Sequence, residues 1–323
     1  MLHKIQSGVI LGVPKRFLYN MEEKSMKKLL ALALATIMVA ATLVGCGNEA
    51  ASTETGASEV VSTEVAEAKG AKVIDVELTQ EDYAFGVDST QPELVEKANE
   101  FIAQIKADGT LDAICDKYFG GGEATPVVSA ELDESKDQLV VATNLAFEPF
   151  EYLDGENIVG IDMELAALLA EYLGKELVIQ NMDFDAVCLA VGQQKCDIAM
   201  AGLTVTEERK EILTFTDSYY KASQLIIVPA ANTEFDACTT VEEVEAILAA
   251  KDASTKIGVQ QGTTGQFYSE GDEDWGFAGF PVTTVPYKTG ALAVQDLING
   301  NVNYVIIDAA PAHCITDNIN AVQ

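Results

Sequence analysis

The chain has 323 residues, 48% of them hydrophobic and 22% charged, which is enough apolar sequence for about two domains with cores of their own. Its net charge of −31 argues against a nucleic-acid partner and against adsorption to an anionic membrane surface. Only two histidines occur, which disfavours Ser-His-Asp or Cys-His catalysis and multi-histidine metal sites, and we expect neither a metal nor another cofactor.

The first patterned stretch combines two lysines with a short apolar run, LLALALATIMVAAT. The run is shorter than the roughly 20 residues that cross a bilayer, so it predicts an export signal over residues 1–45 with its core at 26–45. The run leads into LVGC, which resembles the lipobox of bacterial lipoproteins and implies lipidation of Cys46. Residues 46–70 are rich in Ala, Ser, Thr and Glu and predict a flexible acidic tether.

Two strands and two helices are expected next. Residues 72–78 alternate as a strand, and residues 83–87 form a second one. Pro92 opens an amphipathic helix that stops at a glycine, and residues 111–119 form another helix. The glycine-rich residues 120–137 predict a flexible linker of 18 residues.

From residue 138 onward, short apolar strands alternate with amphipathic helices. This alternation predicts an α/β fold, with mostly parallel sheets and helices on both faces. The stretches LAVGQQKCDIAMAG and LINGNVNYVIID share one order, namely helix, glycine, short polar gap, strand and loop. The sequence therefore indicates two similar lobes with a cleft between them.

The motif GLTVTEER, residues 202–209, joins a buried strand to a helix start. Thr206 is a plausible N-cap, and the only arginine after Arg16 is Arg209. Backbone N–H groups, the Thr204 hydroxyl and the Arg209 guanidinium can converge there on a carboxylate. The alternative is a surface turn that carries an exposed arginine.

Five cysteines follow Cys46 without metal-binding spacing. They predict buried free thiols, and a Cys188–Cys196 disulfide stays open.

Seven stretches together resemble the polar-amino-acid solute-binding proteins of ABC importers. The stretches are ATNLAFEPFEY, IVGIDMELAALLAEYLG, MDFDAV, GLTVTEER, FTDSYY, IGVQQGTT and VNYVIIDAAPA. The resemblance implies a two-lobed periplasmic-binding-protein fold of type II, the Venus-flytrap fold. Residues 72–119 also resemble this family, but they resemble its last segment, so the order of the chain looks circularly permuted.

The resemblance implies a division of the chain into segments of the two lobes. These are a lobe 2 strand segment at 71–83, lobe 1 helices at 84–121, a linker at 122–137, lobe 1 at 138–226 and lobe 2 at 227–323. Two alternatives to an intramolecular permutation stay open, namely a rearranged gene whose product does not fold and pairing of the segment with a neighbouring molecule.

The family resemblance also implies a ligand site. Arg209 would hold the ligand carboxylate, helped by Thr204 and by backbone donors near Gly202 and Thr263–Thr264, and Asp308 would accept the ammonium. Helix capping is the alternative role for Asp308, Thr263 and Thr264, and at Asp308 both roles could hold at once. The remaining expected members are two aromatic residues that stack on the ligand and one pocket residue: Phe147, Phe184 and Asn144.

We therefore expect a monomeric, membrane-anchored lipoprotein on the extracytoplasmic face. It would capture a free amino acid and deliver it to the permease subunits of an ABC importer. The alternatives are an enzyme resembling cyclohexadienyl dehydratase, with Glu148 as a weak candidate acid, and a sensory amino-acid-binding module. Glu148 could otherwise favour a cationic ligand or point to solvent.

Overall fold

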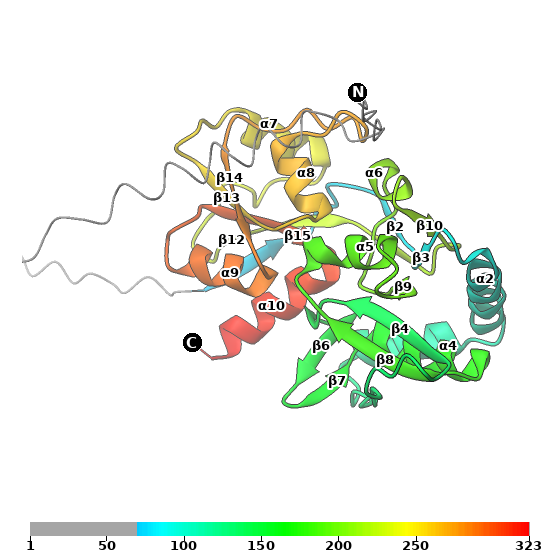
Figure 1. Ribbon diagram of the computed structural model, residues 1–323. Helices are drawn as coiled ribbons and strands as arrows, with labels where there is room; N and C mark the ends of the chain where they lie inside the picture. Colours follow the sequence, from blue (N-terminus) through cyan, green and yellow to red (C-terminus); the bar gives the residue numbers. More distant parts are fainter. Residues whose placement is uncertain (1–69, 323) are drawn as a thin grey trace, which may run out of the picture. The chain divides into compact units, whose positions relative to one another are not determined.

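The computed structural model describes residues 70–322, in which two five-stranded sheets each form the centre of a lobe (Figure 1). The sheet of lobe 1 has the order β10-β3-β9-β4-β8. Its strands are β3 (Gly86–Asp88), β4 (Gln138–Thr143), β8 (Glu176–Asn181), β9 (Ile198–Ala199) and β10 (Leu213–Phe215). The sheet of lobe 2 has the order β1-β12-β15-β13-β14. Its strands are β1 (Ala71–Ile74), β12 (Gln224–Pro229), β13 (Lys256–Gln260), β14 (Thr283–Tyr287) and β15 (Tyr304–Asp308).

Two small sheets and nine helices complete the described residues, 70–322. One ribbon pairs β2 (Glu81–Tyr83) with β11 (Tyr220–Ala222), and the other joins β5 (Ala146–Phe147), β6 (Glu151–Asp154) and β7 (Asn157–Val159). Lobe 1 carries α2 (Pro92–Ala107), α3 (Thr110–Phe119), α4 (Ile161–Leu173), α5 (Phe184–Gly192) and α6 (Glu207–Lys210). Lobe 2 carries α7 (Val241–Ala249), α8 (Thr264–Glu270), α9 (Gly290–Ile298) and α10 (Ala309–Ala321).

Strand alternation divides the core of lobe 2 between the two faces of its sheet. Leu225 and Ile227 of β12 pack with the residues of α9 and α10, whereas Ile226 and Val228 pack with those of α7 and α8. Successive side chains of a strand point to opposite faces, so a continuous apolar strand such as QLIIVP needs helices on both sides. This arrangement agrees with the predicted α/β two-lobed fold.

The sheets are more mixed than predicted. In each five-stranded sheet two pairings are parallel and two are antiparallel. Each antiparallel pairing involves β10 or β12, between which the chain passes from lobe 1 to lobe 2, or one of the strands of the early segment, β1 and β3. Parallel pairing requires a connection that returns the chain to the same end of the sheet, and a helical crossover provides it. Strands that are not joined in this way can pair antiparallel.

The segment before residue 120 contributes to both lobes of its own chain. Strand β1 pairs antiparallel with β12, and β3 lies between β9 and β10. Helices α2 and α3 pack on α4, with Phe101, Ile102 and Ile105 buried in the shared core. The predicted helices agree with the structure, but the strand predicted at 72–78 is shorter and the strand predicted at 83–87 is split in two. The chain leaves β1 after Ile74, and β2 and β3 are separate strands because the chain crosses between the lobes there.

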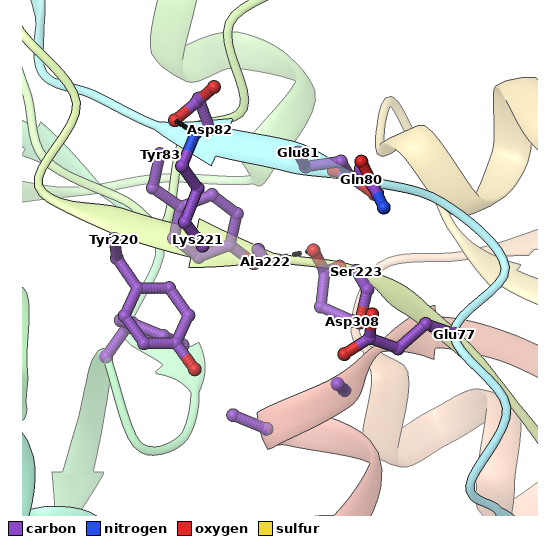
Figure 2. A pocket seen from close by; sticks show the side chains of 13 residues that line it. Glu77, Gln80, Glu81, Asp82, Tyr83, Tyr220, Lys221, Ala222, Ser223 and Asp308 are labelled. Atoms are coloured by element: carbon purple, nitrogen blue, oxygen red, sulfur yellow. Dashed lines mark hydrogen bonds and ion pairs between the residues drawn. The ribbon is translucent and has the colours of Figure 1, made fainter.

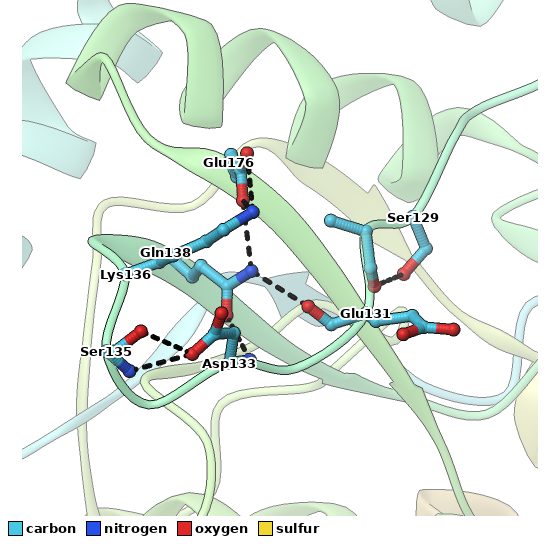
Figure 3. A network of polar contacts seen from close by, with 8 residues as sticks. Ser129, Glu131, Asp133, Ser135, Lys136, Gln138 and Glu176 are labelled. Carbon is cyan, nitrogen blue, oxygen red and sulfur yellow. Dashed lines mark hydrogen bonds and ion pairs between the residues drawn. The ribbon is translucent and has the colours of Figure 1, made fainter.

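Residues 122–137 are tied to lobe 1, contrary to the expected flexible linker (Figure 3). The Ala130 N–H donates to the Leu177 carbonyl at 2.8 Å, and the Ile179 N–H donates to Ser129 Oγ at 2.9 Å. The Gln138 amide bridges the Glu131 carbonyl and the Asp133 N–H. Strand β8 is the edge of its sheet, and its free backbone groups hold this segment.

Five cysteines of the described residues are free, at positions 115, 188, 196, 238 and 314. Cys196 is buried and the others are partly exposed, so the expectation of buried thiols holds only for Cys196 and no Cys188–Cys196 disulfide forms. Cys46, the predicted signal and most of the tether lie outside the described residues. None of the helices between residues 70 and 322 has the length and apolar composition needed to span a bilayer.

Candidate functional site

Arg209 lies in the short helix α6 that follows β9, as the predicted helix start requires, and its side chain is buried with 7% exposure. Thr206 is the N-cap of α6, and its hydroxyl accepts the Arg209 N–H at 3.1 Å. The guanidinium donates to the Thr204 carbonyl at 2.6 Å and to the Gly262 carbonyl of lobe 2 at 3.0 Å. It also lies 5.4 Å from the ring centre of Phe184. Arg209 is therefore a contact between the lobes rather than an exposed arginine.

The turn before Arg209 is held by two acidic residues that the sequence did not predict for the site. The Gly202 N–H donates to Asp162 at 2.9 Å, so this expected backbone donor is occupied. Gly202 has a φ of +52°, and a Cβ there would meet the Phe147 ring at 2.8 Å. The Thr204 hydroxyl donates to Glu81 at 2.7 Å.

Thr263 and Thr264 lie in lobe 2, at the start of α8. Thr263 occupies the N-cap position of α8, but its hydroxyl donates to the Gln260 carbonyl at 2.8 Å. Thr264 is buried, and its hydroxyl has no hydrogen-bond partner among residues 70–322. Gly262, which precedes them, accepts a hydrogen bond from Arg209, so this helix start faces lobe 1.

Asp308 ends β15 and occupies the N-cap position of α10 without making a capping hydrogen bond. Its carboxylate instead accepts the Tyr83 hydroxyl at 2.5 Å, and the side chain is 4% exposed. Burial, followed by the nearby Glu81 charge, raises the pKa of Asp308 to about 7. The alternative capping role is thus not the one that this structure shows.

Hydrogen bonds join Asp308 to the arginine side of the site. Tyr83, which donates to Asp308, forms a β-bridge with Thr204, whose carbonyl accepts from Arg209. Glu81 accepts from Thr204 and from Gln224 at 3.0 Å. A guanidinium and two carboxylates are therefore connected through one threonine and the ribbon of β2 and β11.

Asn144 and the two aromatic residues lie on lobe 1. The Asn144 amide donates to the Met182 carbonyl at 2.7 Å and accepts from Gln260 of lobe 2 at 3.2 Å. Phe147 is buried and Phe184 is half-buried. Glu148 is half-buried and accepts a hydrogen bond from Asn318 of α10 at 2.9 Å, so it does not simply point to solvent.

Four side chains that the sequence analysis missed belong to this region: Glu81, Tyr83, Glu151 and Asp162. Asp162 had a usable signal, because it precedes Leu165 and Leu169 by three and seven residues on the apolar stripe of α4. Glu151 starts β6 directly after the buried Phe150. The other two lie in the short crossing strand β2, where three residues carry no readable period.

A cavity of about 500 Å³ opens beside Asp308, between β2, β11 and the first turn of α10 (Figure 2). Tyr83, Phe150 and Tyr220 supply aromatic walls, and Glu77 adds an exposed carboxylate. Of the predicted site residues, Asp308 alone lines it. Arg209, Asn144 and the Thr263–Thr264 pair belong to the contact between the lobes instead.

Comparison with known proteins gives the family. The model of the bacterial extracellular solute-binding proteins, family 3, matches residues 139–304. The arginine-binding extracellular protein ArtP of Bacillus subtilis is 40% identical over 95 residues, which cover 29% of this chain and 37% of that protein. The ABC transporter arginine-binding protein 1 of Escherichia coli is 27% identical over 175 residues, covering 54% of this chain and 64% of that protein.

A solved structure of an ancestral arginine-binding protein bound to arginine is 33% identical, with a TM-score of 0.48. The match covers 58% of this chain and 76% of that one. The chain spans less than two thirds of the length of either curated relative. The family match covers half of the chain, however, and includes Arg209, Thr263 and Thr264. The chain belongs to the bacterial extracellular solute-binding proteins, family 3.

Proposed function

We propose that this protein captures a free, positively charged amino acid between its lobes and delivers it to the permease of an ABC importer. The observation that carries the proposal is the joining of the buried Arg209 to the buried acids Glu81 and Asp308. An amino acid presents a carboxylate and an ammonium, which are the complements of these groups. The relatives named as arginine-binding and as parts of ABC transporters support the same choice.

The lobes touch directly in this structure, as they would in a closed form that holds its ligand between them. Besides the bonds of Arg209 and Asn144, Gln261 donates to Asp185 at 2.8 Å and Lys288 pairs with Asp183 at 2.6 Å. Arg209 has five N–H donors and uses two groups on carbonyls, so donors remain for a carboxylate. In the proposal, ligand contacts on both lobes shift the population toward this closed form.

The preference for a cationic side chain rests on the acidity of the site. Glu151 and Asp162 are fully buried, and Asp308 is 4% exposed. In the described part of the chain, Arg209 is the only basic side chain that is buried to this degree. A second positive charge on the ligand would relieve the repulsion among these carboxylates.

Three further features belong to the proposal. Cys46 would be lipidated and hold the protein on the extracytoplasmic face as a monomer that works with membrane permease subunits. Phe147 and Phe184 would contact the ligand, with Gly202, Thr263 and Thr264 beside it. The protein would bind without catalysis, as the names of its relatives suggest.

A thermal-shift screen of the twenty amino acids, followed by calorimetry, tests the proposal. Arginine or another cationic amino acid at 100 times its Kd should stabilise the fold by about 2.7 kcal/mol. Arg209→Ala should lose at least about 100-fold in affinity, because a bidentate charge-assisted pair is removed. Lys210→Ala is the matched control, since within residues 70–322 this neighbouring lysine forms an ion pair only with the exposed Glu207. Equal binding by both variants, or turnover of the ligand, would refute the assignment.

A further inference from the structure

Four buried carboxylates form one group around the contact between the lobes. We name Glu81, Glu151, Asp162 and Asp308 the acid cluster; their exposures are 4%, 0%, 0% and 4%. They come from four elements, namely β2, β6, α4 and the end of β15 (Figure 2 shows Glu81 and Asp308). The negative charges of Asp162 and Asp308 act on Glu151, and the negative charge of Glu81 acts on Asp308.

Nothing basic within the described residues neutralises this cluster. The Arg209 guanidinium donates to two backbone carbonyls rather than to a carboxylate. Lys221 lies near β2, but it is exposed and pairs with Asp82 at 2.6 Å. The imidazole of His313 is also exposed and lies against Asp75.

Glu151 is the most isolated member. Neither of its carboxylate oxygens has a hydrogen-bond partner in the described part of the chain. Its neighbour Asp162 accepts from the Tyr219 hydroxyl at 2.6 Å and from the Gly202 N–H, and Asp308 accepts from Tyr83. The charged groups that act on Glu151 are Asp162 and Asp308, and both are acidic.

Burial favours the protonated forms of three members of the cluster, namely Glu151, Asp162 and Asp308. Burial raises the pKa of Glu151 well above its usual value, and the charges of Asp162 and Asp308 add to this effect. Burial also raises the pKa of Asp162 to about 6, while the hydrogen bonds from Tyr219 and Gly202 oppose it. Because the pKa of Asp308 is raised to about 7, a cation that approaches these carboxylates would favour loss of their protons.

We infer that capture of a cationic amino acid is coupled to the release of protons from Glu151, Asp162 and Asp308 of the acid cluster. The inference rests on the proposed function. On binding, the O–H bond of a carboxylic acid breaks and its proton passes to the buffer. The carboxylate of Asp308, which lines the cavity, pairs with the ammonium or guanidinium of the ligand, and the positive charge of the ligand favours the ionised forms of the fully buried Glu151 and Asp162. Uptake would then favour neutral over acidic surroundings.

Titration calorimetry of the full-length protein with L-arginine tests this coupling. At pH 7 the binding heats in phosphate and in Tris should differ by the difference between the ionisation enthalpies of the two buffers, multiplied by roughly one proton per ligand bound. Affinity should rise by about tenfold from pH 6 to pH 7, a range in which arginine itself keeps its charges. Glu151→Gln should release fewer protons than the wild type. Glu156→Gln, an exposed change in the same ribbon, should release the wild-type number.

The outcomes separate the two proposals. Binding of arginine with the same heat in both buffers, and with no pH dependence, overturns proton release and leaves the proposed function intact. Failure to bind any cationic amino acid overturns both. The wild-type measurement decides even if Glu151→Gln does not fold.

Discussion

At the scale of single residues, a few side chains serve two roles. Arg209 lies over the Phe184 ring, donates a hydrogen bond to lobe 2 and retains further donors for a ligand. Lysine could not replace it, because an ammonium lacks the planar fork that reaches the Thr204 and Gly262 carbonyls together. Asp308 has a similar double position, since it both ends a strand and accepts a hydrogen bond from the crossing ribbon.

Glu151→Gln should change stability in a pH-dependent way. The pKa of Glu151 is raised in the folded state, so its contribution is fully present below the unfolded pKa, about 4.3, and is lost as pH rises through the folded value. The free energy of unfolding of the variant minus that of the wild type should therefore be about 1–3 kcal/mol larger at pH 8 than at pH 5. Urea unfolding at both pH values measures this, with Glu156→Gln as control; a difference that does not change with pH would contradict it.

Sequence alone predicted the site unevenly, and the reason is physical. Arg209 and Thr206 were found because an N-cap and a rare arginine are local signals, and the N-cap is confirmed. The proximity of Glu81 and Tyr83 to Asp308 depends on a pairing across more than 200 residues, which no local pattern encodes. Ligand roles of the predicted residues stay predictions.

At the scale of elements, the early segment completes structures that begin much later in the chain. Strand β1 forms the edge of the lobe 2 sheet, and its end is held by Asn320 of α10. Asn320 accepts from the Ala71 N–H at 3.1 Å and donates to the Ala71 carbonyl at 2.9 Å. A side-chain amide thus takes the place of a neighbouring strand at this edge.

Asn320→Ala should loosen β1 without affecting lobe 1. Loss of two hydrogen bonds at a partly buried position should cost about 1–2 kcal/mol and speed amide exchange of residues 71–74 and 226–229. Exchange in the α2 amides should stay unchanged. Asn303→Ala, which removes a hydrogen bond to Lys256 on another strand, is the control. Uniform acceleration in both lobes would contradict a local role for Asn320.

Helices were easier to predict than strands, because the signals of a helix lie within one short segment whereas strand pairing depends on distant residues. The period of α2 and its opening Pro92 lie within one segment, and the observed Pro92–Ala107 agrees with the prediction. The predicted strand at 83–87 is wrong in its middle, because Phe85 donates its N–H to the Thr216 hydroxyl where the chain changes sheets. The order of residues 120–137 depends on β8, whose free edge is visible only in the assembled sheet.

At the scale of the whole molecule, we propose that the family's fold is built here from a circularly permuted chain. The family model matches residues 139–304, and the residues before it supply β1, β3, α2 and α3. Residues 70 and 71 lie against Asn320, so little additional chain would be needed to join the two ends. The ordered segment 122–137 would be the join that replaces the usual ends.

A repermuted chain tests this proposal. Joining residue 322 to residue 70 through a few glycines, and opening the chain within 122–137, should give a monomer with arginine affinity within about threefold of the original. Calorimetry and light scattering measure both properties. The original chain, prepared alongside, is the control. A domain-swapped dimer, or a repermuted chain that folds but no longer binds, would count against the proposal.

The closeness of residue 70 to residue 320 also bears on how this protein could be made into an optical sensor. Dyes attached at these two positions would both sit on lobe 2, so their energy transfer would stay nearly constant when the lobes hinge. Residues 122–137 lie on β8 of lobe 1. One dye in that segment and another near Asn320 would report the hinge motion as a change in fluorescence.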